Sequence, residues 1–106
     1  MSYRYMRILV MFDLPVTTLA NRKNYTQFRK YLIKSGFLMV QESIYCKISP
    51  NSTSGDAIVE NIRKNKPSEG NIQVLRITEK QYSKIEYIVG EKNHEVINDD
   101  RRLVII

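Results

Sequence analysis

Alternation of apolar and polar positions along the chain predicts a series of short strands. Tyr5–Asp13 is apolar at alternating positions on both faces, which is typical of a buried strand, and Pro15 interrupts the ladder that follows. Two later segments, Phe37–Val40 and Ile44–Ile48, indicate a hairpin or a single bent strand with a bulge. Further apolar segments predict strands at Ile72–Thr78, Glu86–Val89 and Leu103–Ile106.

Helical periodicity appears in two segments between these strands. The first runs from an N-cap at Thr17 or Thr18 to a left-handed C-cap at Gly36. Its core-facing stripe is Asn21, Tyr25, Phe28 and Leu32. The second helix is expected to open at a capping box of Thr53 and Asp56. Its inward residues are Ile58, Val59 and Ile62, and one further helical turn is predicted within Glu79–Lys84.

The order of these elements predicts an α+β fold, the ferredoxin-like βαββαβ sandwich with an extra C-terminal strand. We expect a single domain over residues 1–106, with a core at 1–90 and a C-terminal extension at 91–106. Two helices cover only one face of such a sheet, yet the first strand is apolar on both faces. A face-to-face homodimer, in which the extension takes part in dimerisation, is therefore favoured over a monomer.

Composition excludes several classes of protein. The 106 residues are 42% hydrophobic and 26% charged, which excludes wholesale disorder. Cys46 is the single cysteine, so an internal disulfide scaffold is excluded as well. No segment is apolar for long enough to span a membrane, and Met1–Arg4 does not begin like a signal peptide. We therefore expect a cytoplasmic protein with no membrane partner.

Charge points to a polyanionic partner. There are 17 lysine and arginine residues against 11 acidic ones, a net charge of +6. No acid occurs between Val16 and Gln41, so the first helix has a face of one sign. A solvated cationic face is the ordinary explanation for lysines opposite a core, but an unbroken basic face favours phosphate binding. The candidate nucleic-acid-binding residues are Arg22, Lys23, Arg29, Lys30 and Lys34.

Asp13 is the candidate for catalytic and metal-binding chemistry. It lies at the carboxyl end of the first strand, at the rim of the sheet where ligands collect in α/β folds. Mg²⁺ often takes one or two carboxylates together with water and substrate phosphates, so two Asp13 residues in a dimer would suffice for one ion. The alternative is that Asp13 caps the following loop or helix. We discount His94 as a metal ligand because it lies in a polar stretch without a second histidine or cysteine, and Cys46 as a nucleophile because the sequence pairs it with no histidine.

Four motifs in register resemble a known family. They are Phe12–Pro15, Gly36–Phe37 after the basic helix, Gln41–Tyr45 and Ile77–Gln81. Together they resemble the small CRISPR-associated adaptation protein, the second of the numbered series and the partner of the CRISPR integrase, in its type II-A variant. Each motif alone is weak, but the four together span nearly the whole chain.

This resemblance implies a function in spacer acquisition. It implies a ferredoxin-like homodimer flanked by two integrase dimers, a heterohexamer that holds duplex DNA for insertion into the CRISPR array. It also implies a metal-dependent endonuclease acting on RNA or DNA, with Asp13 as the Mg²⁺ ligand shared across the dimer. One acid per chain makes a sparse active site, so we expect a scaffold first and a nuclease second. The alternative is a toxin-like endoribonuclease of the same fold.

Overall fold

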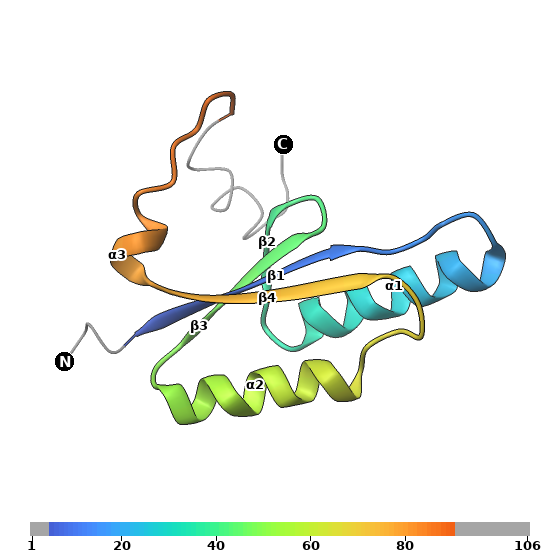
Figure 1. Ribbon diagram of the computed structural model, residues 1–106, viewed down its shortest axis with the longest axis horizontal. Helices are drawn as coiled ribbons and strands as arrows, with labels where there is room; N and C mark the ends of the chain where they lie inside the picture. Colours follow the sequence, from blue (N-terminus) through green and yellow to red (C-terminus); the bar gives the residue numbers. More distant parts are fainter. Residues whose placement is uncertain (1–4, 91–106) are drawn as a thin grey trace.

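Residues 5–90, the part of the chain that a computed structural model describes, form a four-stranded sheet with two long helices on one face (Figure 1). The elements are β1 (Met6–Asp13), α1 (Leu19–Lys34), β2 (Leu38–Gln41), β3 (Ile44–Ser49), α2 (Ser52–Lys64), β4 (Asn71–Thr78) and α3 (Glu79–Tyr82). The strand order is β2-β3-β1-β4, and every neighbouring pair is antiparallel. This topology confirms the predicted ferredoxin-like βαββαβ sandwich.

Helix α1 has the two caps that its sequence predicted. Thr18, rather than Thr17, is the N-cap, and its hydroxyl accepts a hydrogen bond of 3.0 Å from the Asn21 amide. At the other end Gly36 takes a positive φ of +96° and donates its N–H to the Ile33 carbonyl. Phe37 donates to the Leu32 carbonyl, which completes a Schellman motif and turns the chain into β2.

The predicted hairpin forms, and it carries the predicted bulge. β2 and β3 pair with a register shift between Met39 and Gln41, and Ser43 in the turn has a φ of +69°. On β3, Tyr45 is buried against Phe12, with ring centroids 5.8 Å apart. Arg29 of α1 donates its Nε to the Tyr45 hydroxyl at 2.9 Å, so the helix and the hairpin are tied together.

The predicted capping box of α2 is wrong. The N-cap is Asn51, whose side chain accepts a 2.8 Å hydrogen bond from the Ser54 amide, and the helix begins at Ser52. Asparagine is at least as good an N-cap as threonine, and Asn51 comes earlier, so Thr53 is already inside the helix. Asp56 accepts a 2.8 Å hydrogen bond from Arg76 of β4 instead of reaching back to a cap.

The core lies between the helices and one face of the sheet. Alternate residues of β1 point toward the helices, and Ile8, Val10 and Phe12 are buried there. Phe12 packs edge to face on Phe28 of α1, with ring centroids 5.3 Å apart. The other buried apolar members of this cluster are Leu14, Leu32, Phe37, Tyr45 and Ile62. Ile58 and Val59 of α2 are half-buried, in keeping with the inward face predicted for that helix.

The opposite face of the sheet, which we call the open face, has no long helix over it in the described part of the chain. Its members follow from the register of the strands: Leu9, Met11, Asp13, Leu38, Ile44, Cys46, Ile48, Gln73, Leu75 and Ile77, together with Arg7. Leu38, Ile48 and Leu75 are 54%, 47% and 49% exposed. An apolar surface of this kind is characteristic of a site that meets another molecule.

Short helix α3 follows β4 directly and is held to one end of the open face. A capping box of Thr78 and Gln81 starts it. Arg7 of β1 forms an ion pair with Glu79, and its guanidinium carbon lies 4.1 Å from the centre of the Tyr82 ring. Burial lowers the pKa of Arg7, but hydrogen bonds to Glu79 and Cys46 outweigh it and raise the pKa above its ordinary value.

The strand predicted at Glu86–Val89 is wrong. Residues 86–90 form no strand, and Ile88 and Val89 are strongly exposed. The chain rises from α3 away from the edge of β4 (Figure 1), so no neighbouring strand is available to this apolar segment. The predicted strand Leu103–Ile106 and the extension 91–106 lie outside the described residues. No helix within residues 5–90 is long and apolar enough to cross a membrane.

Candidate functional site

Asp13 ends β1 at the rim of the sheet, where the sequence placed it. It stands opposite Asn71 of β4, and the preceding residue, Phe12, donates its backbone N–H to the Ser43 carbonyl at 3.0 Å. The carboxylate is exposed and makes no hydrogen bond or ion pair with any other residue in the range 5–90. The cap of α1 is Thr18, so Asp13 does not serve as the N-cap of that helix. This carboxylate is therefore available to a ligand.

Gly70 fixes the backbone around Asp13, and sequence reasoning did not single it out. It has a φ of +104°, and a Cβ placed on it would lie 2.5 Å from Cδ2 of Leu14 and 3.0 Å from the Asp13 carbonyl oxygen. The first distance is too short for a real Cβ, so the Leu14 side chain would have to move, and the second is an unusually tight contact with backbone. The only signal in the sequence is its place in a turn-forming segment before β4. Gly70 thus allows the β4 end to press against the residues that present the carboxylate.

One chain supplies a single acid at this position. Within residues 5–90 no group of three or more histidine, cysteine, aspartate or glutamate side chains could hold a metal ion. Mg²⁺ accepts a site of one or two carboxylates completed by water and phosphate oxygens, so the chemistry of Asp13 fits this ion. Asp13 lies on the open face, next to Leu9 and Met11, so any molecule that covers this face also approaches the carboxylate.

The five basic candidates on α1 divide into two groups. Arg22 donates to the Val16 carbonyl at 3.1 Å, and Arg29 donates to the Tyr45 hydroxyl, so both guanidinium groups have partners in the fold. The other three, Lys23, Lys30 and Lys34, are exposed and make no hydrogen bond or ion pair with another residue in the range 5–90. Their spacing of seven and four residues places them on one line of the helix, which we call the lysine stripe.

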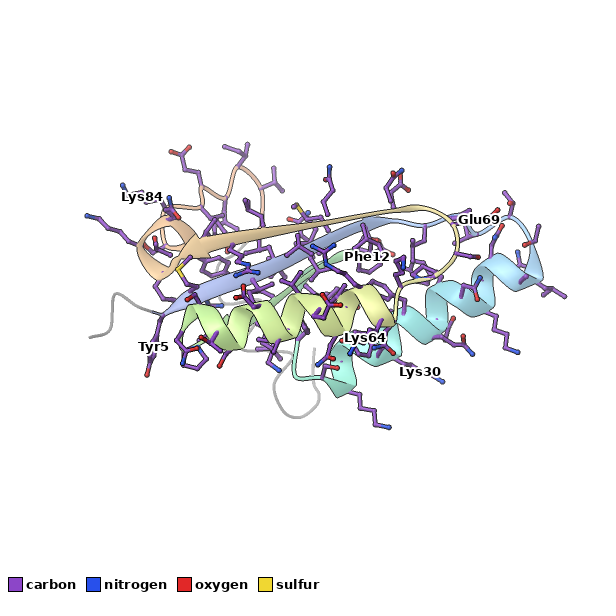
Figure 2. The ribbon with its side chains drawn as sticks, turned by 60° about the horizontal axis from the view of Figure 1, so that its bottom comes forward. Tyr5, Phe12, Lys30, Lys64, Glu69 and Lys84 are labelled. Carbon is purple, nitrogen blue, oxygen red and sulfur yellow. The ribbon has the colours of Figure 1, made fainter. Side chains whose placement is uncertain are left out.

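The structure does not bring Asp13 and the lysine stripe into one site. Asp13 lies on the open face, whereas α1 and its lysines cover the other side of the sheet. Figure 2 shows Lys30 projecting from α1 on the side away from the strands. The molecule therefore has two separate candidate surfaces, one acidic and apolar and the other basic. His94 lies outside the described residues, and Cys46 is buried within hydrogen-bond distance of Arg7.

Comparison with known proteins gives a consistent result. The family model described as CRISPR associated protein Cas2 matches residues 6–85. A protein of Treponema denticola named CRISPR-associated endoribonuclease Cas2 is 57% identical over 101 residues, which are 95% of this chain and 100% of that protein. Proteins of the same name from Streptococcus mutans serotype c and Ligilactobacillus salivarius are 41% and 42% identical, each over 95% of this chain and 93% and 100% of the relative.

A solved structure supports the fold separately. A crystal structure of Cas2 aligns with a TM-score of 0.58 over 95% of this chain and 99% of that one, at 13% identity. A sequence identity this low supports a statement about the fold alone, and that fold is the same βαββαβ sandwich. The sequence relatives carry the family, and it is the family that the four motifs resemble. By its family match over residues 6–85 and its 57% identity to the relative from Treponema denticola, the chain belongs to the CRISPR-associated Cas2 family.

Proposed function

We propose that the protein works in CRISPR spacer acquisition as a homodimeric scaffold that binds duplex DNA together with the CRISPR integrase. The observation that carries this proposal is the opposite character of its two surfaces. The open face is apolar, while the surface of α1 carries only positive charge. An apolar face suits a second copy of the chain, and a basic face suits phosphate.

The dimer is proposed to form with the open faces of two chains together. Leu38, Ile48 and Leu75 lie on β2, β3 and β4, so the apolar surface extends across the whole width of the sheet. Burying it removes apolar area from water at about 25 cal/mol per Å². In this arrangement the helices of both chains point outward and the two Asp13 residues approach the shared interface. The extension 91–106 is proposed to add to the same interface.

Nucleic acid is proposed to bind on the outward helices. The lysine stripe neutralises successive phosphates without reading bases, so binding is expected to be nearly independent of sequence and steeply dependent on salt. A twofold dimer presents this stripe on two outer surfaces, which suits a duplex held between two flanking integrase dimers. Arg22 and Arg29 keep further donors on their guanidinium groups and are proposed to add to the same surface.

A metal-dependent endonuclease is the second candidate function. Two observations favour it: the exposed carboxylate of Asp13, which has no partner among residues 5–90, and the name endoribonuclease carried by relatives such as that of Treponema denticola. The Asp13 residues of both chains would hold the ion, and RNA or DNA would be the substrate. Mg²⁺ bound there would supply Lewis-acid stabilisation of charge on a phosphodiester. Asp13 itself would act as a metal ligand, because its negative charge would hold the ion in place.

Spacer integration with purified integrase separates the two functions. The comparison uses wild type, Asp13→Ala, and the double variant Lys30→Glu/Lys34→Glu. The scaffold proposal expects Asp13→Ala to integrate normally and the charge reversal to abolish integration. Loss of integration in Asp13→Ala, with its dimer and its DNA binding intact, would overturn the ranking and make the metal chemistry primary.

Cleavage is tested in a separate assay without integrase. Labelled RNA and duplex DNA are incubated with the protein in Mg²⁺ or in EDTA. The nuclease proposal expects cleavage only with Mg²⁺ and none with Asp13→Ala. Asp13→Asn is the matched control, since it keeps the size and removes the charge. Equal cleavage by wild type and both variants would show that the activity belongs to a contaminant or to another site.

A further inference from the structure

A polar groove runs between α1 and the connection from α2 to β4, on the helix side of the molecule. Its volume is about 380 Å³. Asn24, Gln27 and Tyr31 of α1 form one wall, and Asn65, Lys66 and Ser68 form the other. The first three are spaced by three and four residues, so their side chains lie along one line of the helix. Neither the basic surface nor the open face, as assigned above, includes this groove.

The groove gathers hydrogen-bonding groups that the fold does not use. The side chains of Asn24, Gln27, Tyr31 and Ser68 have no hydrogen bond to any other residue within 5–90. Other polar residues of this layer do have partners: Asn21 donates to Glu69 at 2.8 Å, for example. The ring of Tyr31 packs on Phe28, with centroids 6.1 Å apart, so the phenol is fixed in place while its hydroxyl has no partner among these residues.

The charge of the residues that line the groove has one sign. None of the lining residues is acidic, and Lys66 belongs to the wall opposite α1. At 100° per residue, Gln27 lies between the centre of the groove wall and the lysine stripe, about 40° from the stripe. The stripe therefore runs along one rim of the groove. Glu69, which follows Ser68 in the chain, does not line the groove and accepts a hydrogen bond from Asn21.

We propose that this groove binds the sugar–phosphate backbone of one strand of the bound nucleic acid. The proposal rests on the nucleic-acid binding proposed above and gives it a second, uncharged contact. Amide N–H groups and hydroxyls of asparagine, glutamine, serine and tyrosine are ordinary donors to phosphate and sugar oxygens. From Asn24 to Tyr31 the wall is about 10 Å long, which is enough to contact a short stretch of one strand. Lys23, Lys30 and Lys34 then contact phosphates at the rim.

The test compares two substitutions that add the same charge to the same helix. Gln27→Glu places a carboxylate in the groove, and Thr26→Glu places one at an exposed position on the other side of the lysine stripe. Binding of a fluorescent 30-base-pair duplex of mixed sequence is measured for each. We expect Gln27→Glu to weaken binding about tenfold more than Thr26→Glu, because only Gln27→Glu removes a donor from the groove and places a negative charge where the strand is proposed to lie.

A neutral variant separates the groove from general electrostatics. Tyr31→Phe keeps the packing on Phe28 and removes only the hydroxyl. It is expected to weaken binding about threefold at every salt concentration without changing the slope of log K against log salt. Lys30→Glu, by contrast, should reduce that slope. Circular dichroism of each variant establishes that the fold is kept.

Different outcomes overturn different parts of the argument. If wild type binds the duplex and Lys30→Glu weakens it, but Gln27→Glu and Thr26→Glu weaken it equally and Tyr31→Phe has no effect, the groove is not a contact and only this inference fails. If wild type does not bind the duplex at low salt, the proposed nucleic-acid binding fails and the groove proposal fails with it.

Discussion

At the scale of single residues, two features leave the Asp13 carboxylate available to a ligand. The carboxylate has no partner in the described chain, and Gly70 beside it has no side chain. A carboxylate that the fold itself needs is normally hydrogen-bonded or paired. Arg29 shows the opposite case, since its bond to Tyr45 gives it a structural task besides any contact with phosphate. A residue predicted for binding can thus belong to the framework as well.

Replacing Gly70 by alanine is expected to destabilise the protein through its contact with Asp13 and Leu14. The matched control is Gly90→Ala, because Gly90 has nearly the same φ, +107° against +104°, but an added Cβ there would meet no atom within 4 Å among the described residues other than its chain neighbours. Both variants carry the cost of a positive φ, and only Gly70→Ala carries the clash. We expect Gly70→Ala to lower the free energy of unfolding by about 1–3 kcal/mol more than Gly90→Ala. Urea denaturation measures this, and equal losses in the two variants would contradict it.

At the scale of elements, patterns within one segment were predictable and pairings between segments were not. The apolar stripe and caps of α1 are local features, so the sequence predicted that helix almost to the residue. Glu86–Val89 has the composition of a strand, but a strand also needs a neighbour, and none lies beside it in residues 5–90. Asp13 was predictable from the end of its strand. Gly70 was not, because its effect comes from a contact with residues far away in the sequence.

The corrected start of α2 gives a prediction at this scale. Asn51→Ala removes the side chain that accepts from the Ser54 amide, and we expect it to lower the free energy of unfolding by about 1 kcal/mol. Thr53→Ala is the control, since Thr53 is an exposed residue inside the first turn, and it should change stability by less than about 0.5 kcal/mol. Thermal and urea unfolding of both variants decide the matter. A larger loss for Thr53→Ala would restore the capping box of Thr53 and Asp56.

At the scale of the whole molecule, the sheet separates two surfaces that the proposed function uses together. The helices carry the lysine stripe and the groove on one side, and the open face with Asp13 lies on the other. In a face-to-face dimer the basic surfaces would point outward and the two carboxylates inward. Binding of nucleic acid and Mg²⁺ chemistry would then take place in different parts of the assembly. A variant of one surface is therefore expected to spare the function of the other.

The dimer is the assumption on which this arrangement depends, and Leu75→Glu tests it. Leu75 is 49% exposed on the open face, opposite Leu9, so a carboxylate there is tolerated in one chain but would be buried against its copy in a dimer. We expect the variant to sediment as a folded monomer, with a dimer dissociation constant at least about a hundredfold higher. Leu19→Glu is the control. It makes the same substitution at another exposed leucine, which lies at the start of α1 and away from the open face.

The same variant also tests whether the metal site is shared. A monomer keeps its own Asp13 but lacks the second one, and a single carboxylate is a weak anchor for Mg²⁺. Leu75→Glu should therefore lose Mg²⁺-dependent cleavage even though Asp13 is intact, while Leu19→Glu keeps it. Cleavage at the wild-type level by a monomeric Leu75→Glu protein would mean that one chain is sufficient for the chemistry. In that case the role of the open face would be to hold the two basic surfaces at a fixed distance, and the catalytic ligands would have to be sought around Asp13 within a single chain.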